Sequence, residues 1–146
     1  MAASELNQFI VISLNSKKYG INVQNIDSII FKQNITRVPG AQSYFLGVIN
    51  LRGEVVPVMS LKSRLGLSDD GEYSSKARII IVKPEAQSTS LGLLVDQVNE
   101  VMTLDSSKIE KMSYDENDEK AKFNAGIGKV DNDLIDLLDI TAISRT

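Results

Sequence analysis

Few segments of this chain carry residue types whose spacing could support chemistry. The segment Gly126-Ile-Gly128-Lys129 has the composition of a phosphate-binding loop, but it lacks the full glycine spacing and the Ser or Thr after the lysine. Asp136 and Asp139 are three residues apart and could in principle do acid–base work, although solvated or capping roles are favoured. The acidic run 115–119 could hold a cation. It lacks the alternating pattern of ligands and glycine, so a solvated loop is favoured there.

The composition removes the commonest catalytic and metal-binding side chains. The chain of 146 residues has no His, Cys or Trp. Zinc and copper sites therefore lose their usual ligands, and a catalytic site loses its commonest general base and its best thiol nucleophile. The sequence predicts no enzyme, no cofactor and no metal site. Zero Cys also excludes a disulfide framework and fits a reducing compartment.

The ends of the chain and its apolar runs favour a cytoplasmic protein. The N-terminus has neither a basic nor an apolar signal region, and no apolar run approaches the ~20 residues of a membrane helix. We therefore expect no direct membrane insertion. Residues 1–66 carry seven Lys and Arg against three Asp and Glu, whereas residues 67–146 carry nine against sixteen. The halves have opposite charge, which is compatible with surface drift, two contact faces or head-to-tail association.

The chain matches itself at a nearly constant distance. Residues 19–29 recur as residues 91–101, so that Gly20 corresponds to Gly92, and residues 47–61 recur as residues 126–140. Such matches predict two copies of one small β unit, each too small to be more than marginally stable alone. We expect approximate repeats at 7–66 and 77–143 within one domain, 7–143, joined by a polar linker at 67–76. The two units should pack together and leave a groove between them.

The local patterns predict mostly strands. Runs of β-branched and aliphatic residues are bounded by turn residues throughout the chain. The expected strands are 9–14, 19–23, 28–31, 47–51, 55–59, 77–83, 91–96, 100–104, 125–130 and 134–138. Short helical turns are expected at 24–26, 41–46 and 61–65, with a longer one from 105 to 112, and Asp96 is expected to cap the turn after its strand. Ten short strands at turn-rich spacing are typical of small barrels or a sandwich.

The segment 47–61 is the most informative motif in the sequence. It reads Gly-Val-Ile-Asn-Leu-Arg-Gly-Glu-Val-Val-Pro-Val-Met-Ser-Leu, a hairpin whose tip carries Arg52 and Gly53. With Tyr19-Gly20-Ile21 before it, and Gly92–Val101 and Leu138-Asp139-Ile140 after it, the chain resembles the CheW-like family of bacterial chemotaxis proteins over residues 7–143. One departure is Ser60, which stands where the family usually has Asp. Neither half shows the basic, aromatic-rich stripe of a nucleic-acid-binding protein.

The resemblance implies a fold and a function. The fold would be mostly β, with two pseudo-symmetric five-stranded SH3-like β-barrels and short helical turns. The protein would be a non-catalytic adaptor that couples the cytoplasmic tips of chemoreceptors to the histidine kinase CheA and is recruited to membrane-associated receptor arrays. By this analogy the partner-binding residues are Ile26, Ile29, Val98 and Val101 in the groove, and Gly47, Asn50, Arg52 and Gly53 in the hairpin.

Two other interpretations of the chain's function remain open. The chain could be a CheW-like regulatory domain of a larger chemotaxis protein, although its start at Met1 and its end just after the last strand favour a whole small protein. It could also be a small-molecule-binding β-barrel, against which the absence of His and Cys counts. Core packing is the alternative role of the four groove residues.

Overall fold

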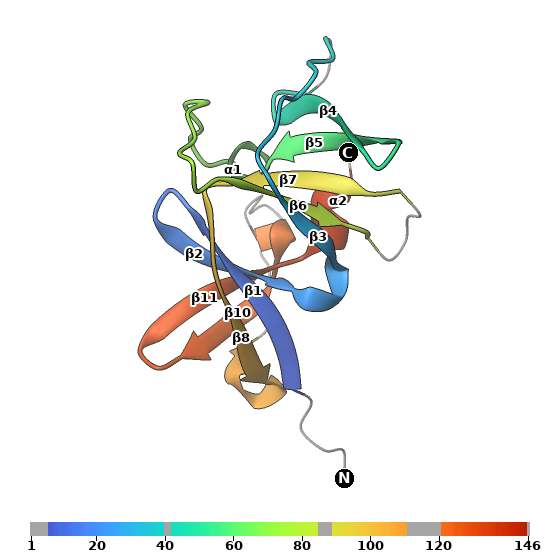
Figure 1. The fold of residues 1–146 in the computed structure, drawn as a ribbon. Coiled ribbons are helices and arrows are strands. Elements are labelled where there is room, and N and C mark those ends of the chain that lie inside the picture. The colour runs from blue at the N-terminus through green and yellow to red at the C-terminus, as the bar shows by residue number, and fades with distance from the viewer. Residues whose placement is uncertain (1–5, 40–41, 85–88, 111–120, 146) are drawn as a thin grey trace.

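The protein folds into two twisted β-sheets, one above the other in the view of Figure 1, with an apolar cluster shared between them. The structure is a computed structural model that describes residues 6–39, 42–84, 89–110 and 121–145. One sheet contains β1 (Leu6–Leu14), β2 (Lys17–Asn22), β8 (Gln97–Asp105), β9 (Ile109–Glu110), β10 (Asn124–Val130) and β11 (Asp133–Leu138). The other contains β3 (Ile26–Phe31), β4 (Phe45–Leu51), β5 (Glu54–Ser60), β6 (Arg78–Val82) and β7 (Leu91–Val95). The helices are α1 (Leu61–Arg64) and α2 (Ile140–Ser144), with short 3-10 turns η1 (Val23–Asn25), η2 (Ser106–Lys108) and η3 (Ala121–Phe123). No helix in the described segments is long and apolar enough to cross a membrane.

The two sheets repeat one pattern of strand pairing. Their strand orders are β8-β1-β2-β11-β10-β9 and β3-β6-β7-β5-β4. In the first sheet β2 pairs in parallel with β11 and places Gly20 opposite Leu137. In the second sheet β7 pairs in parallel with β5 and places Gly92 opposite Val58. These four positions are the ones that the internal sequence matches relate, so the matched segments take equivalent places in the fold.

The sheets do not follow the two halves of the chain, and the expectation that each half forms its own unit is wrong. The first half supplies β1 and β2 to one sheet and β3, β4 and β5 to the other. The second half supplies β6 and β7 to the sheet of β3–β5, and β8 to β11 to the sheet of β1 and β2. The physical reason lies in the crossovers. Asn22 caps η1 by accepting from the N–H of Gln24, and this turn sends the chain from β2 into the other sheet at Ile26. The short connection at Asp96, between β7 and β8, makes the return crossing.

Three apolar clusters hold the sheets together. One lies between the two sheets and takes side chains from both, among them Ile12, Ile21, Ile80, Leu93 and Ile143. The other two clusters are the separate interiors of the two barrels. Strand β7 is buried along its whole length because Leu93 faces the central cluster and Leu94 faces a barrel interior. A strand covered on both faces reads as a continuous apolar run, as 91–95 does.

Arg64 in α1 contacts residues of α2 and η3, and so connects the last helix of the first half to the last helix of the second half. Its guanidinium carbon lies 4.6 Å from the ring centre of Tyr44 and 4.8 Å from that of Phe123. The same side chain donates from Nε to the carbonyl oxygen of Ile143 at 2.9 Å. Helices α1 and α2, which follow equivalent strands, are therefore joined directly.

The local predictions differ from the structure at two places, and a third prediction falls outside the described residues. The helix expected from 105 to 112 is only the turn Ser106–Lys108, capped by Asp105 and followed by β9. Residue 41 of the helical turn expected at 41–46 lies outside the described residues; in the rest, the N–H of Phe45 donates to the carbonyl oxygen of Gln42 at 3.0 Å in a single turn, and β4 already begins at Phe45. The acidic run 115–119 and most of the loop around it lie outside the described residues.

Candidate functional site

The central cluster reaches the surface along β3 and β8. Ile26 and Val98 are half-buried and pack against that cluster. Ile29 and Val101 are more open, with exposed fractions of 38% and 56%. The four residues that the sequence assigns to a groove are therefore at the surface of the fold, and none is fully buried in the core.

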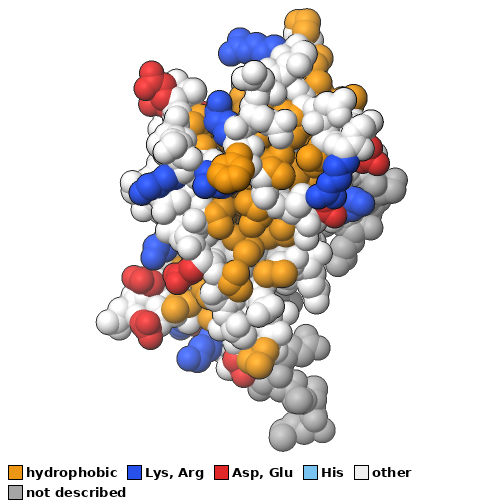
Figure 2. All heavy atoms as spheres, viewed as in Figure 1, with side chains coloured by type: hydrophobic (Ala, Val, Ile, Leu, Met, Phe, Trp, Pro, Cys, Tyr) orange, Lys and Arg blue, Asp and Glu red, His pale blue; other side chains and the backbone are white. Residues whose placement is uncertain are grey.

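The strand registers explain why these four residues face the same region. Side chains directly opposite each other in an antiparallel pair point to the same face of the sheet. The cross-strand neighbours are Val82 for Ile26, Ile80 for Ile29, Ile12 for Val98 and Ile10 for Val101. Val82, Ile80 and Ile12 belong to the central cluster, and Ile10 packs against it. We call the surface formed by Ile26, Ile29, Val98 and Val101 the inter-sheet groove. Figure 2 shows hydrophobic side chains gathered at the middle of this face, where β1, β3 and β8 lie in Figure 1.

The other predicted partner-binding residues lie in the hairpin between β4 and β5, whose tip is charged. Arg52 and Gly53 form its turn, and the Oδ1 atom of Asn50 accepts a hydrogen bond from the N–H of Gly53 at 3.2 Å. Asn50, Arg52 and Gly53 are exposed, whereas Gly47 is buried. A Cβ atom on Gly47 would lie 2.1 Å from the carbonyl oxygen of Thr36, so Gly47 has a packing role and could affect a partner only indirectly.

The turn does not depend on Gly53 alone. Arg52 has a φ of 53° and Gly53 a φ of 82°, so both central residues are in the left-handed region that a type I′ hairpin requires. The Cβ atom of an arginine is sterically strained in this region, whereas glycine has no Cβ atom. Asp131, the equivalent of Arg52 in the β10–β11 hairpin, also has a φ of 53°. Both hairpins therefore place a charged residue in the same strained backbone position.

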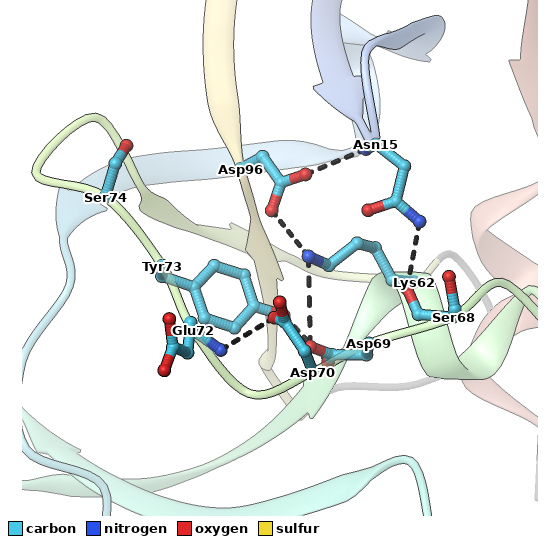
Figure 3. Close-up of a pocket in the computed structure, with 9 residues that line it drawn as sticks. All are labelled: Asn15, Lys62, Ser68, Asp69, Asp70, Glu72, Tyr73, Ser74 and Asp96. Atoms are coloured by element: carbon cyan, nitrogen blue, oxygen red, sulfur yellow. Dashed lines mark hydrogen bonds and ion pairs between the residues drawn. The ribbon is translucent and has the colours of Figure 1, made fainter.

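A second site lies beside the start of β8, around a buried lysine (Figure 3). Lys62 in α1 is only 3% exposed. Its Nζ atom lies 2.8 Å from Oδ1 of Asp96 and 3.8 Å from Oδ1 of Asp69, and it sits 4.4 Å from the ring centre of Tyr73. The sequence predicted that Asp96 would cap the turn after its own strand. The structure shows that its carboxylate instead accepts from the N–H of Asn15, in the β1–β2 turn, at 2.8 Å. This network joins α1, the linker, the β7–β8 crossover and the β1–β2 turn.

Ser60, which stands where the family usually has Asp, caps α1 and contacts Asp69. Ser60 accepts from the N–H of Ser63 as the cap of α1, and its Oγ atom donates to Oδ2 of Asp69 at 2.5 Å. Burial opposes ionisation of Asp69. Hydrogen bonds from Ser60, Gly71 and Tyr73, together with the charge of Lys62, nevertheless hold the pKa of Asp69 below its ordinary value of 3.8. Burial raises the pKa of the Tyr73 hydroxyl well above its usual range. The linker thus supplies a carboxylate that β5 lacks.

The remaining chemical candidates have structural partners. Lys129 lies in β10 and pairs with Glu110 at 2.6 Å, so its segment does not form a phosphate loop. Asp136 pairs with Lys17 at 2.9 Å, and Asp139 caps α2 by accepting from the N–H of Ala142. The cavity of about 470 Å³ beside Lys62 is lined mainly by Asp, Glu, Ser and Asn. Within the described ranges, no three His, Cys, Asp or Glu side chains are placed to hold a metal.

Sequence reasoning named four residues that the structure places at the surface, and it missed the lysine network. Lys62 follows an apolar strand and precedes Ser63 and Arg64, a context in which a lysine is ordinarily exposed. The only signal in the sequence was Ser60 in place of an aspartate, followed by the acidic residues Asp69 and Asp70.

Two sheets with exchanged strands, a central core and an apolar surface along β3 and β8 define a two-barrel scaffold of the CheW type. The model of the CheW-like domain matches residues 8–146, and the chain belongs to this family. Among its relatives, the chemotaxis protein CheW of Bacillus subtilis is 37% identical over 136 residues, covering 93% of this chain and 85% of the relative. The chemotaxis protein CheW of Thermotoga maritima is 34% identical over 143 residues, covering 97% and 91%.

The fold has a close counterpart among solved structures. The scaffolding protein TtCheW from Thermoanaerobacter tengcongensis superposes with a TM-score of 0.87 at 31% identity, over 97% of this chain and 94% of that one. The expected fold class, mostly β with two SH3-like barrels, is confirmed. The structure adds one detail, because the short strand β9 makes one of the two sheets six-stranded.

Proposed function

We propose that this protein is a cytoplasmic, non-catalytic adaptor that couples the tips of chemoreceptors to the histidine kinase CheA in membrane-associated arrays. Family membership and relatives named as chemotaxis proteins support this proposal. The similarity to a solved protein described as a scaffolding protein supports it further. The observation that carries it is the inter-sheet groove, an apolar surface built from equivalent strands of the two sheets.

The groove suits a helical partner. Its floor is the edge of the central cluster, and its two sides come from β3 and β8. An amphipathic helix binds such a surface by placing residues three and four apart in the groove. We assign the receptor tip to the groove and the kinase regulatory domain to the barrel ends, where Asn50, Arg52 and Gly53 lie. The groove residues make an apolar contact, and Arg52 adds a charge-assisted one.

The function is tested by reconstitution with receptor-containing membranes and CheA. The kinase should sediment with the membranes only when this chain is added, and the chain alone should turn over no nucleotide, ester or peptide substrate. The adaptor assignment fails if the kinase sediments equally without the chain, or if the pure chain shows enzymatic turnover.

Substitution of Arg52 by Asn should separate stability from binding. Asn tolerates the left-handed backbone better than Arg, so the free energy of unfolding should rise by about 0.5–1 kcal/mol. Loss of the guanidinium should weaken kinase binding by about 1–3 kcal/mol, the range of a charge-assisted hydrogen bond. Arg52→Lys should restore part of the binding if the contact is bidentate. Thermal melting and titration calorimetry measure both quantities. Unchanged binding would show that Arg52 is a turn residue only.

A further inference from the structure

Phe31 is a large exposed aromatic side chain next to the groove. It is the last residue of β3, two positions beyond Ile29, and 72% of it is exposed. Alternate residues of a strand point to the same side, so Phe31 extends the row of groove side chains beyond Ile29. Aromatic side chains, Phe among them, are enriched at protein interfaces relative to the rest of the surface.

The ring is held in place by Arg78. Arg78 is the direct cross-strand neighbour of Phe31 in β6, and its guanidinium carbon lies 4.4 Å from the ring centre. The Nη1 atom of Arg78 donates to the carbonyl oxygens of Ser75, at 3.0 Å, and Ala77, at 2.7 Å. The guanidinium is thereby fixed against the ring, and the ring's position is defined before any partner binds.

Among the described residues, Arg78 pairs with no carboxylate and has hydrogen-bond donors to spare. Within the described part of the chain it makes no ion pair, and its Nε and Nη2 atoms make no hydrogen bond. The segments 28–39 and 73–81 contain no Asp or Glu, and they contribute the cations Lys32, Arg37, Lys76 and Arg78. Figure 2 shows Lys and Arg side chains beside the upper part of the hydrophobic patch. This end of the groove is therefore apolar and basic.

We propose that Phe31 and Arg78 form a specificity contact for a helix that carries an Asp or Glu next to an apolar residue. The apolar residue would lie on the Phe31 ring, and the carboxylate would accept from the free edge of the Arg78 guanidinium. A planar guanidinium with two free donors on one edge suits a carboxylate better than an ammonium does. The inference rests on the proposed function, because it places this helix at one end of the groove assigned to the receptor.

The experiment measures binding of a soluble helical-hairpin fragment of a receptor's cytoplasmic tip to the full chain by titration calorimetry. Phe31→Ala should weaken binding at least tenfold, whereas the matched control Phe31→Tyr should weaken it less than threefold. Arg78→Gln should weaken binding about fivefold to tenfold and reduce its dependence on salt, and Arg78→Lys should keep part of the affinity. The melting temperature of each variant is recorded to confirm folding.

The possible outcomes separate this inference from the proposed function. If Val101→Asp abolishes binding while Phe31→Ala and Arg78→Gln leave it unchanged, the groove assignment stands and the inference is wrong. If the unaltered chain does not bind the fragment, the receptor assignment fails and the inference fails with it. If Phe31→Ala converts a self-associated chain to a monomer in sedimentation, and fragment binding is unaltered, the surface fits a second copy and the inference is again overturned.

Discussion

Ile29→Asp and Val101→Asp are expected to weaken binding of the receptor-tip fragment about a hundredfold while the chain stays folded. Both side chains are partly exposed, so in the free protein the new carboxylate can remain in water. In the complex the carboxylate would be enclosed by apolar groups without a partner, which costs about 3 kcal/mol or more. That cost corresponds to about a hundredfold in the dissociation constant. Titration calorimetry measures the affinity, and circular dichroism measures the melting temperature.

Ile26→Asp and Val98→Asp provide the matched comparison at the equivalent positions of the two strands. Both residues are half-buried against the central cluster, so these variants should lower the melting temperature as well as the affinity. Asp27→Asn, on the exposed side of β3, is a control that should change neither quantity. Normal affinity in folded Ile29→Asp and Val101→Asp would remove the groove from the receptor interface.

The repeated sequence predicts which positions are equivalent but cannot predict which strands pair. Gly20 and Gly92 match because each lies where a parallel strand packs closely. A Cβ atom on Gly20 would be 2.8 Å from a methyl group of Leu137, and one on Gly92 would be 3.0 Å from a methyl group of Val58. Either a closed half or an exchanged arrangement could satisfy this requirement. The exchange is decided by the crossovers at η1 and Asp96, whose direction is a tertiary property.

The groove could be predicted because its residues are apolar at equivalent positions, which is a local feature of sequence. The Lys62 network could not, since its members come from residues 15, 60, 62, 69, 73 and 96 and each is ordinary in its own segment. Only the fold shows that Lys62 is buried and that the linker brings Asp69 to it. Phe31 and Arg78 were missed for the same reason, because their pairing depends on the register between β3 and β6.

Replacement of the buried Lys62 should produce one of the largest losses of stability available to a single substitution in this chain. Lys62→Met removes the cation between two carboxylates while keeping the length of the side chain. The Asp69 side chain is only 8% exposed and would keep its hydrogen bonds from Ser60, Gly71 and Tyr73 but lose its nearby cation. Breaking a buried ion pair in this way costs about 3–5 kcal/mol. Denaturant unfolding measures the change in the free energy of unfolding.

Lys17→Met is the control, because Lys17 pairs with Asp136 at a similar distance but its side chain is 59% exposed. An exposed pair contributes less than about 1 kcal/mol, so the two lysine variants should differ by severalfold. A similar small loss for both would show that the Lys62 cluster is a solvated surface feature.

The Lys62 network should also affect the groove, because Asp96 begins the crossover that continues into β8 and lies two residues before Val98. Its carboxylate is fixed from two sides, by Lys62 in α1 and by the N–H of Asn15 in the β1–β2 turn. Asp96→Asn keeps the shape of the side chain and its hydrogen bond to Asn15 but removes the ionic contact with Lys62. We expect it to weaken receptor-fragment binding without altering any residue of the groove. Unchanged affinity in a folded but destabilised Asp96→Asn variant would show that the two sites act independently.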